Sequence, residues 1–502
     1  MKSNRMTRRL FMQRSTALGL SISAPGMFGL PQAGLAAPPG VFNDADFRMP
    51  SVLPQVINVF LYGGPSELAG NLTNIARINA NSQNPYPNGV LQTLDENGQI
   101  TRNGFWRDAG GLEMEDMLAS RDLSIYRTIN RRKENTQAHR PSVFSSLKGS
   151  LSIEDAPGMG STLAAFLNAH RDQLDGSDLL RGRQLTNMVL PFISFEGTTP
   201  AFQADPDGQL PLTLRGLSLD ERFDNPYTRD NNDNDIALEA LIRKVVNKNQ
   251  QTRYTKVVEG FDRRRNMEEL IGNLQNAADN PLPMPPPQAD GSPDPDVDPA
   301  TGSLVYPGNN SFSGRLKAAV TLAVQNPDSL FITVGGGLGG WDDHSSAIED
   351  YVPRMQQLMR ALRVAVKHIR YSDMAYGGTR NTDNIIINVH GDFGRNVNLN
   401  NSEGWDHGNN QNLYTLGGSA IRPANALGKV VGKTELYGPA KQNRQYTRPT
   451  DDSYEAEPLS IASSVYQYFG AANPRVLTRG GEMNPDGDVA IDETVAGESR
   501  FW

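Results

Sequence analysis

The chain has 502 residues, and its 48 Lys and Arg against 56 Asp and Glu give a formal net charge of −8. An acidic chain of this kind lacks the basic footprint of a nucleic-acid-binding protein, so no nucleic-acid partner is expected. The 37% share of hydrophobic residues and a mean hydropathy of −0.50 exclude a protein that crosses the membrane many times. Cysteine is absent, which removes disulfides, thiolate metal sites and cysteine nucleophiles.

The first 36 residues have the layout of a twin-arginine export signal. Thr7–Gln13 (TRRLFMQ) carries the paired arginines, a mildly apolar stretch follows over Thr16–Leu30, and small residues stand at Gly34–Ala36. The apolar stretch is too short and too rich in Gly, Ser and Pro for a stable membrane span. We therefore predict an exported protein, periplasmic or secreted to the cell surface, with a linker over 37–54. A disordered basic tail is the alternative.

Apolar runs rich in β-branched residues alternate with amphipathic segments along the rest of the chain. The apolar runs predict buried strands over Gln55–Tyr62, Leu123–Ile129, Met188–Phe195, Leu330–Val334 and Asn384–Val389. The amphipathic segments predict helices over Ser161–Arg171, Ile236–Asn249, Arg315–Gln325 and Ser345–Arg370. Strands separated by helices predict an α/β fold, a three-layer α/β/α sandwich around a mostly parallel sheet. We expect one such domain over 55–470 and a C-terminal tail over 471–502.

A segment rich in proline and aspartate interrupts this pattern over 280–301. Its composition predicts a loop that packs no hydrophobic core. The run Asp294–Asp298 (DPDVD) could hold calcium. The glycine and the distal glutamate of an EF-hand loop do not follow at the required spacing, so a solvated acidic insertion is the favoured interpretation.

Three of the six histidines lie in loops rich in glycine and aspartate. His344 (in GWDDH) and His390 (in VHGDFGR) each follow a predicted buried strand, and His407 lies in GWDHG. Carboxylate oxygens and imidazole nitrogens are ligands of Zn²⁺ and Mn²⁺, and loops at the carboxyl ends of parallel strands converge on one crevice. The pattern favours a shared metal site over three local turns. His170 and His368 lie on helical patterns and are interpreted as packing or surface residues.

These segments resemble, in the same order, the motifs of a known bacterial family. Gly340–His344 (GWDDH) is similar to its GWDTH motif, Gly391–Arg395 (GDFGR) to SEFGR, and Gly404–Gly408 (GWDHG) to GTDHG. Val59–Ser66 (VFLYGGPS) resembles its first strand and GGPS turn. The chain thus resembles the domain-of-unknown-function family 1501 over about Gln55–Gly470. That family is commonly exported through the twin-arginine route and is similar to sulfatases and the alkaline phosphatase superfamily.

The resemblance implies an alkaline-phosphatase-like domain with a divalent-metal site, holding zinc or manganese, with calcium also possible. Asp342, His344 and His407 would hold one metal ion, and Asp392 would hold the second. Superfamily enzymes carry an Asp after the first strand as a further ligand. This chain has none there, and Glu67, with Ser66 as the less favoured alternative, could replace it.

Ala138–Ser142 (AHRPS) is similar to the nucleophile segment of sulfatases, which places His139 in the nucleophile position. His139 could equally be a metal ligand or a general acid, or it could only order its loop. Arg395 would bind the substrate anion through a bidentate contact.

Together these features imply an exported metal-dependent hydrolase of phosphate or sulfate esters, with an anionic small molecule or a glycan as substrate. The alternative is a non-catalytic metal-binding or cell-surface structural protein with a degenerate site, which the missing first-strand Asp favours. A secreted carbohydrate-binding protein, which would suit the Asn- and Gly-rich loops, is a third and weaker interpretation. The sequence does not identify which protein partners the chain has.

Overall fold

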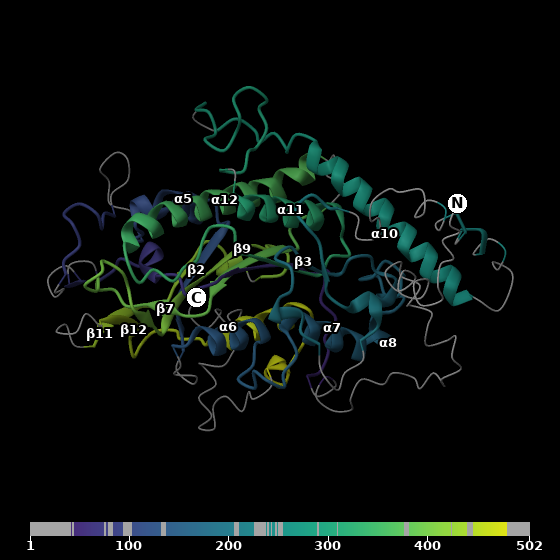
Figure 1. Ribbon diagram of the computed structural model, residues 1–502, viewed down its shortest axis with the longest axis horizontal. Coiled ribbons are helices and arrows are strands. Elements are labelled where there is room, and N and C mark those ends of the chain that lie inside the picture. The colour runs from purple at the N-terminus through teal and green to yellow at the C-terminus, as the bar shows by residue number, and fades with distance from the viewer. Residues whose placement is uncertain are drawn as a thin grey trace, which may run out of the picture.

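An eight-stranded sheet forms the centre of the computed structural model (Figure 1). The strand order is β10-β2-β9-β6-β1-β5-β3-β4, and only β9 runs against its neighbours, β2 and β6. The strands are β1 (Gln55–Leu61), β2 (Leu123–Asn130), β3 (Phe192–Ser194), β4 (Leu217–Ser218), β5 (Phe331–Gly335), β6 (Ile385–Gly391), β9 (Asn410–Gly417) and β10 (Val430–Val431). The predicted α/β fold with a mostly parallel sheet is therefore confirmed.

The structure describes Phe42 and residues 45–478, apart from gaps at 75–76, 79–83, 94–102, 132–136, 205–209, most of 225–254, 289–290, 309, 376–380, 423 and 439–444. The predicted export signal over 1–36 lies outside the described residues, as do half of the residues of the helix predicted over Ile236–Asn249 and the tail beyond 478. No helix in the described part of the chain has the combination of length and hydropathy that crossing a bilayer requires.

Helices cover both faces of the sheet (Figure 1). The longer helices are α5 (Gly111–Ala119), α6 (His139–Lys148), α7 (Met159–Ala169), α10 (Thr255–Asp279), α11 (Ser311–Gln325), α12 (Ala347–Ala375) and α13 (Pro458–Tyr468). In Figure 1 the helices α5, α11 and α12 lie above the sheet, and α6 and α7 lie below it.

Alternate side chains of β1 enter two different hydrophobic cores, because successive strand residues point to opposite faces. Ile57 and Val59 pack into the core that includes residues of α5, α11 and α12. Val56 and Phe60 pack into the core that includes residues of α6, α7 and α13. The two cores on either side of one sheet confirm the predicted three-layer sandwich.

The register of the central strands brings their carboxyl ends to one edge of the sheet. Phe60, near the end of β1, pairs with Gly335 of β5 on one side and with His390 of β6 on the other. The loops that follow these three strands therefore leave the sheet side by side. This is the edge at which parallel α/β sheets bind their ligands.

The segment 280–301 packs against the helical layer, so the prediction of a solvated loop that packs no core is wrong. Asp296 is 4% exposed and accepts hydrogen bonds from Nε and Nη2 of Arg363 at 2.7 and 2.8 Å. Nζ of Lys367 lies 2.7 Å from Oδ1 of Asp294 and 2.8 Å from Oδ2 of Asp296. Arg363 and Lys367 of α12 already balance the charge of these carboxylates, so the carboxylates do not need a calcium ion to do so.

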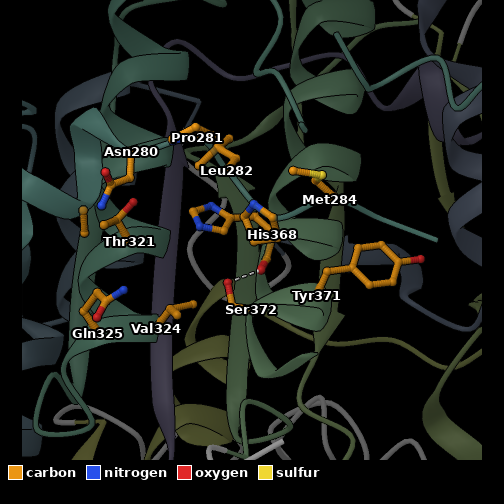
Figure 2. Close-up of a pocket in the computed structure, with 12 residues that line it drawn as sticks. Asn280, Pro281, Leu282, Met284, Thr321, Val324, Gln325, His368, Tyr371 and Ser372 are labelled. Atoms are coloured by element: carbon orange, nitrogen blue, oxygen red, sulfur yellow. Dashed lines mark hydrogen bonds between the residues drawn. The ribbon is translucent and has the colours of Figure 1, made fainter. Parts of the chain in front are cut away.

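A cavity of about 530 Å³ opens between the end of α10, the following proline-rich segment, α11 and α12 (Figure 2). His368 of α12 lies in its wall and is 5% exposed, with the hydroxyl of Tyr306 3.3 Å from its Nδ1. Burial lowers the pKa of His368 to about 3, so the ring is neutral. His170 is also buried, and its Nε2 lies 3.0 Å from the carbonyl oxygen of Phe42. Both histidines pack in the interior, which agrees with their interpretation as packing or surface residues.

Candidate metal centre

Three loops meet above the edge of the sheet where β1, β5 and β6 end. The backbone N–H of Trp341 donates to the carbonyl oxygen of Tyr62 at 2.9 Å, which joins the loops after β5 and β1. The N–H of Gly63 donates to Oδ1 of Asp392 at 3.2 Å, which joins the loops after β1 and β6. Gly63 has a φ of +113°, and a Cβ there would lie 2.7 Å from the backbone nitrogen of Asp342. Glycine is thus required where these loops approach each other.

Three imidazoles converge on one carboxylate oxygen, Oδ1 of Asp342. It lies 3.0 Å from Nε2 of His344, 3.4 Å from Nε2 of His139 and 3.5 Å from Nε2 of His407. The Nε2 atoms of His344 and His407 are 3.0 Å apart. His139, Asp342 and His407 each offer one ligand atom, and these three atoms lie within 4.8 Å of one another. The structure therefore brings together the predicted residues Asp342, His344 and His407, and it adds His139 to them.

The opposite ring nitrogen of each histidine faces an oxygen. Nδ1 of His139 lies 2.8 Å from Oδ2 of Asp392, and Nδ1 of His407 lies 2.6 Å from the carbonyl oxygen of Gln137. A carboxylate or a carbonyl oxygen can only accept, so Nδ1 carries the proton and Nε2 of the neutral ring keeps its lone pair. Such outer partners fix the tautomer and orientation of histidines that bind metals.

His344 repeats this arrangement with a longer contact. Its Nδ1 lies 3.5 Å from Oδ1 of Asp406, one of the two acids whose role the sequence left open. The other acid, Asp343, turns away and pairs with Nη1 of Arg354 at 3.0 Å. Burial raises the pKa of Asp343 despite that arginine. Of the two neighbours, Asp406 is therefore the one that faces the cluster.

The imidazole nitrogens and the carboxylate oxygen of the cluster are chemically suited to a divalent cation. Nε2 of His139 is buried and has no hydrogen-bond partner, an arrangement that is costly unless another group occupies its lone pair. Burial lowers the pKa of His407, and the positive charge of Arg395 lowers it further. Neutral imidazoles beside a carboxylate are the ligand form that Zn²⁺ requires.

Charge around the cluster keeps the carboxylate ionised. Burial by itself would raise the pKa of Asp342, but the hydrogen bond from Arg395 and the nearby imidazoles lower it below its usual value. The hydrogen bond to Asp392 is the main cause that raises the pKa of His139. Phe393 is fully buried, and its ring centroid lies 4.7 Å from that of His139 and 4.5 Å from that of His407. The ring of Phe393 thus packs against two of the imidazoles.

Arg395 lies beneath the cluster, and its side chain is fully buried. Its guanidinium donates to the backbone carbonyl oxygens of Gly64, Trp405, Gly63 and Trp341. It also donates from Nη2 to Oδ1 of Asp342 at 2.6 Å. These five acceptors contact all three nitrogens of the guanidinium, which therefore holds the loops together, whereas the sequence predicted that it faces a substrate anion.

Arg131, directly after β2, positions His139. Its Nε donates to the backbone carbonyl oxygen of Asp392 at 2.6 Å, and its Nη2 donates to the carbonyl oxygen of Ser142 at 2.8 Å and to Oγ of Ser146 at 2.7 Å. The first turns of α6 are thereby tied to the loop that carries Asp392. No signal in the sequence marks Arg131 for this task.

Two residues of the sequence-based metal hypothesis, Glu67 and His390, have other partners outside the cluster. Glu67 is 1% exposed, and its Oε1 accepts a hydrogen bond from Oγ1 of Thr447 at 2.5 Å. Burial raises the pKa of Glu67 to about 7. His390 is buried within β6, with its Nε2 3.1 Å from Oδ1 of Asn58, and burial lowers its pKa to about 3. Neither residue belongs to the group of three that offers convergent ligand atoms.

The fold and the site together define an α/β sandwich with an Asp/His cluster at the carboxyl ends of its parallel strands. The family model described as a protein of unknown function (DUF1501) matches residues 54–449, and the chain belongs to that family, as predicted. No curated protein matches the chain. Among solved structures, the chain is similar to the phosphonate monoester hydrolase of Silicibacter pomeroyi, with 10% sequence identity and a TM-score of 0.30 over 83% of this chain and 73% of that one.

Proposed function

We propose that this protein is a divalent-metal-dependent hydrolase of phosphate or sulfate esters. The observation that carries the proposal is the convergence of three imidazole Nε2 atoms on Oδ1 of Asp342, with the opposite nitrogens of the rings held by oxygens. We expect zinc or manganese, because imidazole nitrogen with carboxylate oxygen is the donor set that suits these ions. The site would hold one ion through His139, His344, His407 and Asp342.

This proposal changes two of the roles that the family resemblance implies. His139 becomes a ligand instead of a nucleophile, because its Nε2 points at Asp342 while Asp392 engages its Nδ1. Asp392 becomes a positioning residue instead of a ligand for a second ion, because its two oxygens accept from His139 and from the N–H of Gly63. Its complete burial keeps that pair rigid.

The chemistry follows from the donor set. A divalent ion held by His139, His344, His407 and Asp342 would polarise an ester oxygen and lower the pKa of a bound water. In the overall reaction the oxygen of water joins phosphorus or sulfur, the bond to the ester oxygen breaks, and the alcohol leaves with a proton taken from the water. The side chain of Asp342 is 45% exposed, as is that of His344, so an ester can approach the cluster from solvent.

Metal content and ester turnover measured on the same preparations test the proposal. Wild-type protein loaded with Zn²⁺ or Mn²⁺ should retain about one ion per chain after dialysis and should hydrolyse aryl phosphates, aryl sulfates or phosphonate monoesters. His344→Ala and His407→Ala should lose both properties, while His170→Gln, which removes a histidine outside the cluster, should keep both. Metal-loaded wild-type protein that turns over no ester above the level of His407→Ala would refute the hydrolase.

A non-catalytic metal-binding or cell-surface structural protein is the second candidate. The engagement of Arg395 by backbone carbonyl oxygens favours it, because Arg395 then offers no free fork to a substrate anion at the cluster. Bound metal without turnover of any ester would decide for this candidate.

The proposal includes export through the twin-arginine route, on the strength of the paired arginines Arg8 and Arg9. Replacing both by lysine should keep the protein in the cytoplasm of a host that has this pathway. Unchanged export of that variant would argue against this route.

A further inference from the structure

The cavity beside His368 contains a buried hydroxyl whose hydrogen-bonding capacity the fold does not use. Thr321 of α11 is 4% exposed, and its Oγ1 has no hydrogen-bond partner among the described residues. In Figure 2 this hydroxyl points toward the ring of His368 across the cavity. Buried polar groups of folded proteins are nearly always hydrogen-bonded, and leaving one unpaired destabilises the fold. The hydroxyl of Thr321 is therefore suited to bind a group that enters the cavity.

The ring of His368 presents a second polar group to the cavity. The hydroxyl of Tyr306, 3.3 Å from Nδ1 of His368, has no other acceptor in the part of the chain that the structure describes. It therefore donates to Nδ1, which places the proton of the neutral ring on Nε2. Nε2 lies at the end of the ring remote from the backbone and has no partner within the described ranges. An N–H donor thus faces the hydroxyl of Thr321.

The rest of the cavity wall is neutral and largely apolar. With His368 neutral, none of its twelve residues, all described by the structure, carries a charge. Val324 and Leu282 contribute aliphatic side chains that are 1% and 9% exposed, whereas Met284 is 67% exposed. The polar pair therefore lies at the buried end of the cavity, and Met284 marks the side that faces solvent. The volume of about 530 Å³ lies within the range of small-molecule pockets.

This cavity is remote from the candidate metal centre. Helix α12 begins at Ala347, directly beyond the loop that carries His344, and His368 follows 21 residues later. At a rise of 1.5 Å per residue this separation is about 30 Å along the helix axis. A ligand of the cavity would therefore bind independently of the proposed ester hydrolysis.

We propose that this cavity is a second binding site, for a neutral alcohol or phenol with a compact apolar body. The hydroxyl oxygen of the ligand accepts from Nε2–H of His368 and exchanges a hydrogen bond with Oγ1 of Thr321. The apolar body packs on Leu282 and Val324, away from water. A charged ligand is excluded, because it would lose its hydration without meeting an opposite charge in the wall.

Binding of two probes that differ in one hydroxyl tests this site. Titration of the full chain with para-fluorophenol and with fluorobenzene, followed by fluorine NMR, gives both affinities. Wild-type protein should bind the phenol about fivefold more tightly, because only the phenol can bond to His368 and Thr321. Thr321→Val, which keeps the shape of the side chain, should lower the affinity for the phenol about threefold and change that for fluorobenzene less than about twofold. Equal affinity of wild-type protein for the two probes, or binding of neither, would overturn the assignment.

Two further variants separate this cavity from other places where an apolar probe could bind. Ala277→Trp introduces an indole at a half-buried position of the cavity wall and should abolish binding of both probes. Thr213→Val removes another buried hydroxyl without a hydrogen-bond partner, outside this cavity, and should bind both probes as wild type does. Binding that survives in Ala277→Trp, or a loss in Thr213→Val equal to that in Thr321→Val, would overturn the assignment.

Discussion

Oδ2 of Asp392 lies 2.8 Å from Nδ1 of His139 and joins two residues 253 positions apart in the chain. This contact decides what His139 can do. With Nδ1 committed to a carboxylate, the proton of the neutral ring stays there and Nε2 faces Asp342 as a lone pair. A histidine held in this way is suited to binding a cation.

Asp392→Asn is therefore expected to weaken metal binding while leaving the fold intact. The amide preserves the shape of the side chain but loses the charge that holds the ring, and losses of this kind cost about 10–100-fold in metal affinity. Competition with a chromogenic chelator measures the affinity. Asp452→Asn, whose side chain is 70% exposed, is the matched control and should bind metal as wild type does. Wild-type affinity in Asp392→Asn would contradict the positioning role.

Arg395→Lys should destabilise the protein by about 3–5 kcal/mol, because an ammonium cannot reach the five acceptors that the buried guanidinium binds. Urea unfolding measures the change in the free energy of unfolding. Arg140→Lys, at a side chain that is 71% exposed, should change it by no more than about 0.5 kcal/mol. A stable Arg395→Lys protein with a raised KM would instead return Arg395 to the role of substrate binder.

Glu67→Gln tests whether Glu67 is a structural acid or a metal ligand. Burial raises the pKa of Glu67 from 4.5 to about 7, so the folded protein holds a proton that the unfolded chain releases between these values. Stability is therefore lost as pH rises from 4.5 to 7, by about 3 kcal/mol in all. Glu67→Gln has no proton to lose, so its free energy of unfolding should not fall in this way. Urea unfolding should therefore show that the variant is more stable relative to wild type at pH 8 than at pH 5. A drop in bound metal would identify Glu67 as a ligand.

The buried ring of His368 should make stability depend on pH in the direction opposite to that expected for Glu67. Burial lowers the pKa of His368 from 6.5 to about 3, so between these values the unfolded chain binds a proton that the folded protein excludes. Stability is lost as pH falls below 6.5, by about 1.4 kcal/mol per pH unit. His368→Gln should lose about 2 kcal/mol less than wild type between pH 7 and pH 5 in urea unfolding. Thr321→Val, in the same cavity wall, should follow wild type, and identical curves for all three proteins would disprove the assignment.

The sequence predicted the elements whose apolar pattern decides their structure. β1, β5, β6, α11 and α12 appear within a few residues of their expected bounds. β9 escaped prediction because its first residues, Asn410, Gln411 and Asn412, are polar although buried. Their side chains bond to other segments of the chain, as Nδ2 of Asn412 does to the carbonyl oxygen of Glu67 at 2.8 Å. Burial that is stabilised by hydrogen bonds leaves no hydrophobic period to detect.

Helix α6 escaped prediction for a related reason. Its sequence HRPSVFSSLK contains a proline in the first turn and three serines, which are poor helix formers. In the folded protein Arg131 bonds to the carbonyl oxygen of Ser142 and to the hydroxyls of Ser145 and Ser146, so tertiary contacts outweigh local propensity.

For the candidate centre, spacing and residue type predicted which loops carry Asp342, His344 and His407. They could not predict that Asp392 turns to His139, or that Arg395 points inward, because these directions depend on side-chain contacts between segments distant in the chain.

X-ray absorption at the zinc edge tests the central claim most directly, because it reports the atoms around a bound ion without requiring turnover. For zinc-loaded wild-type protein we predict imidazole scattering from at least two histidines together with a carboxylate oxygen, and fewer imidazoles in His344→Ala and His407→Ala. Zinc surrounded by oxygen alone, or a spectrum that neither variant changes, would contradict a cation site built from these histidines and Asp342.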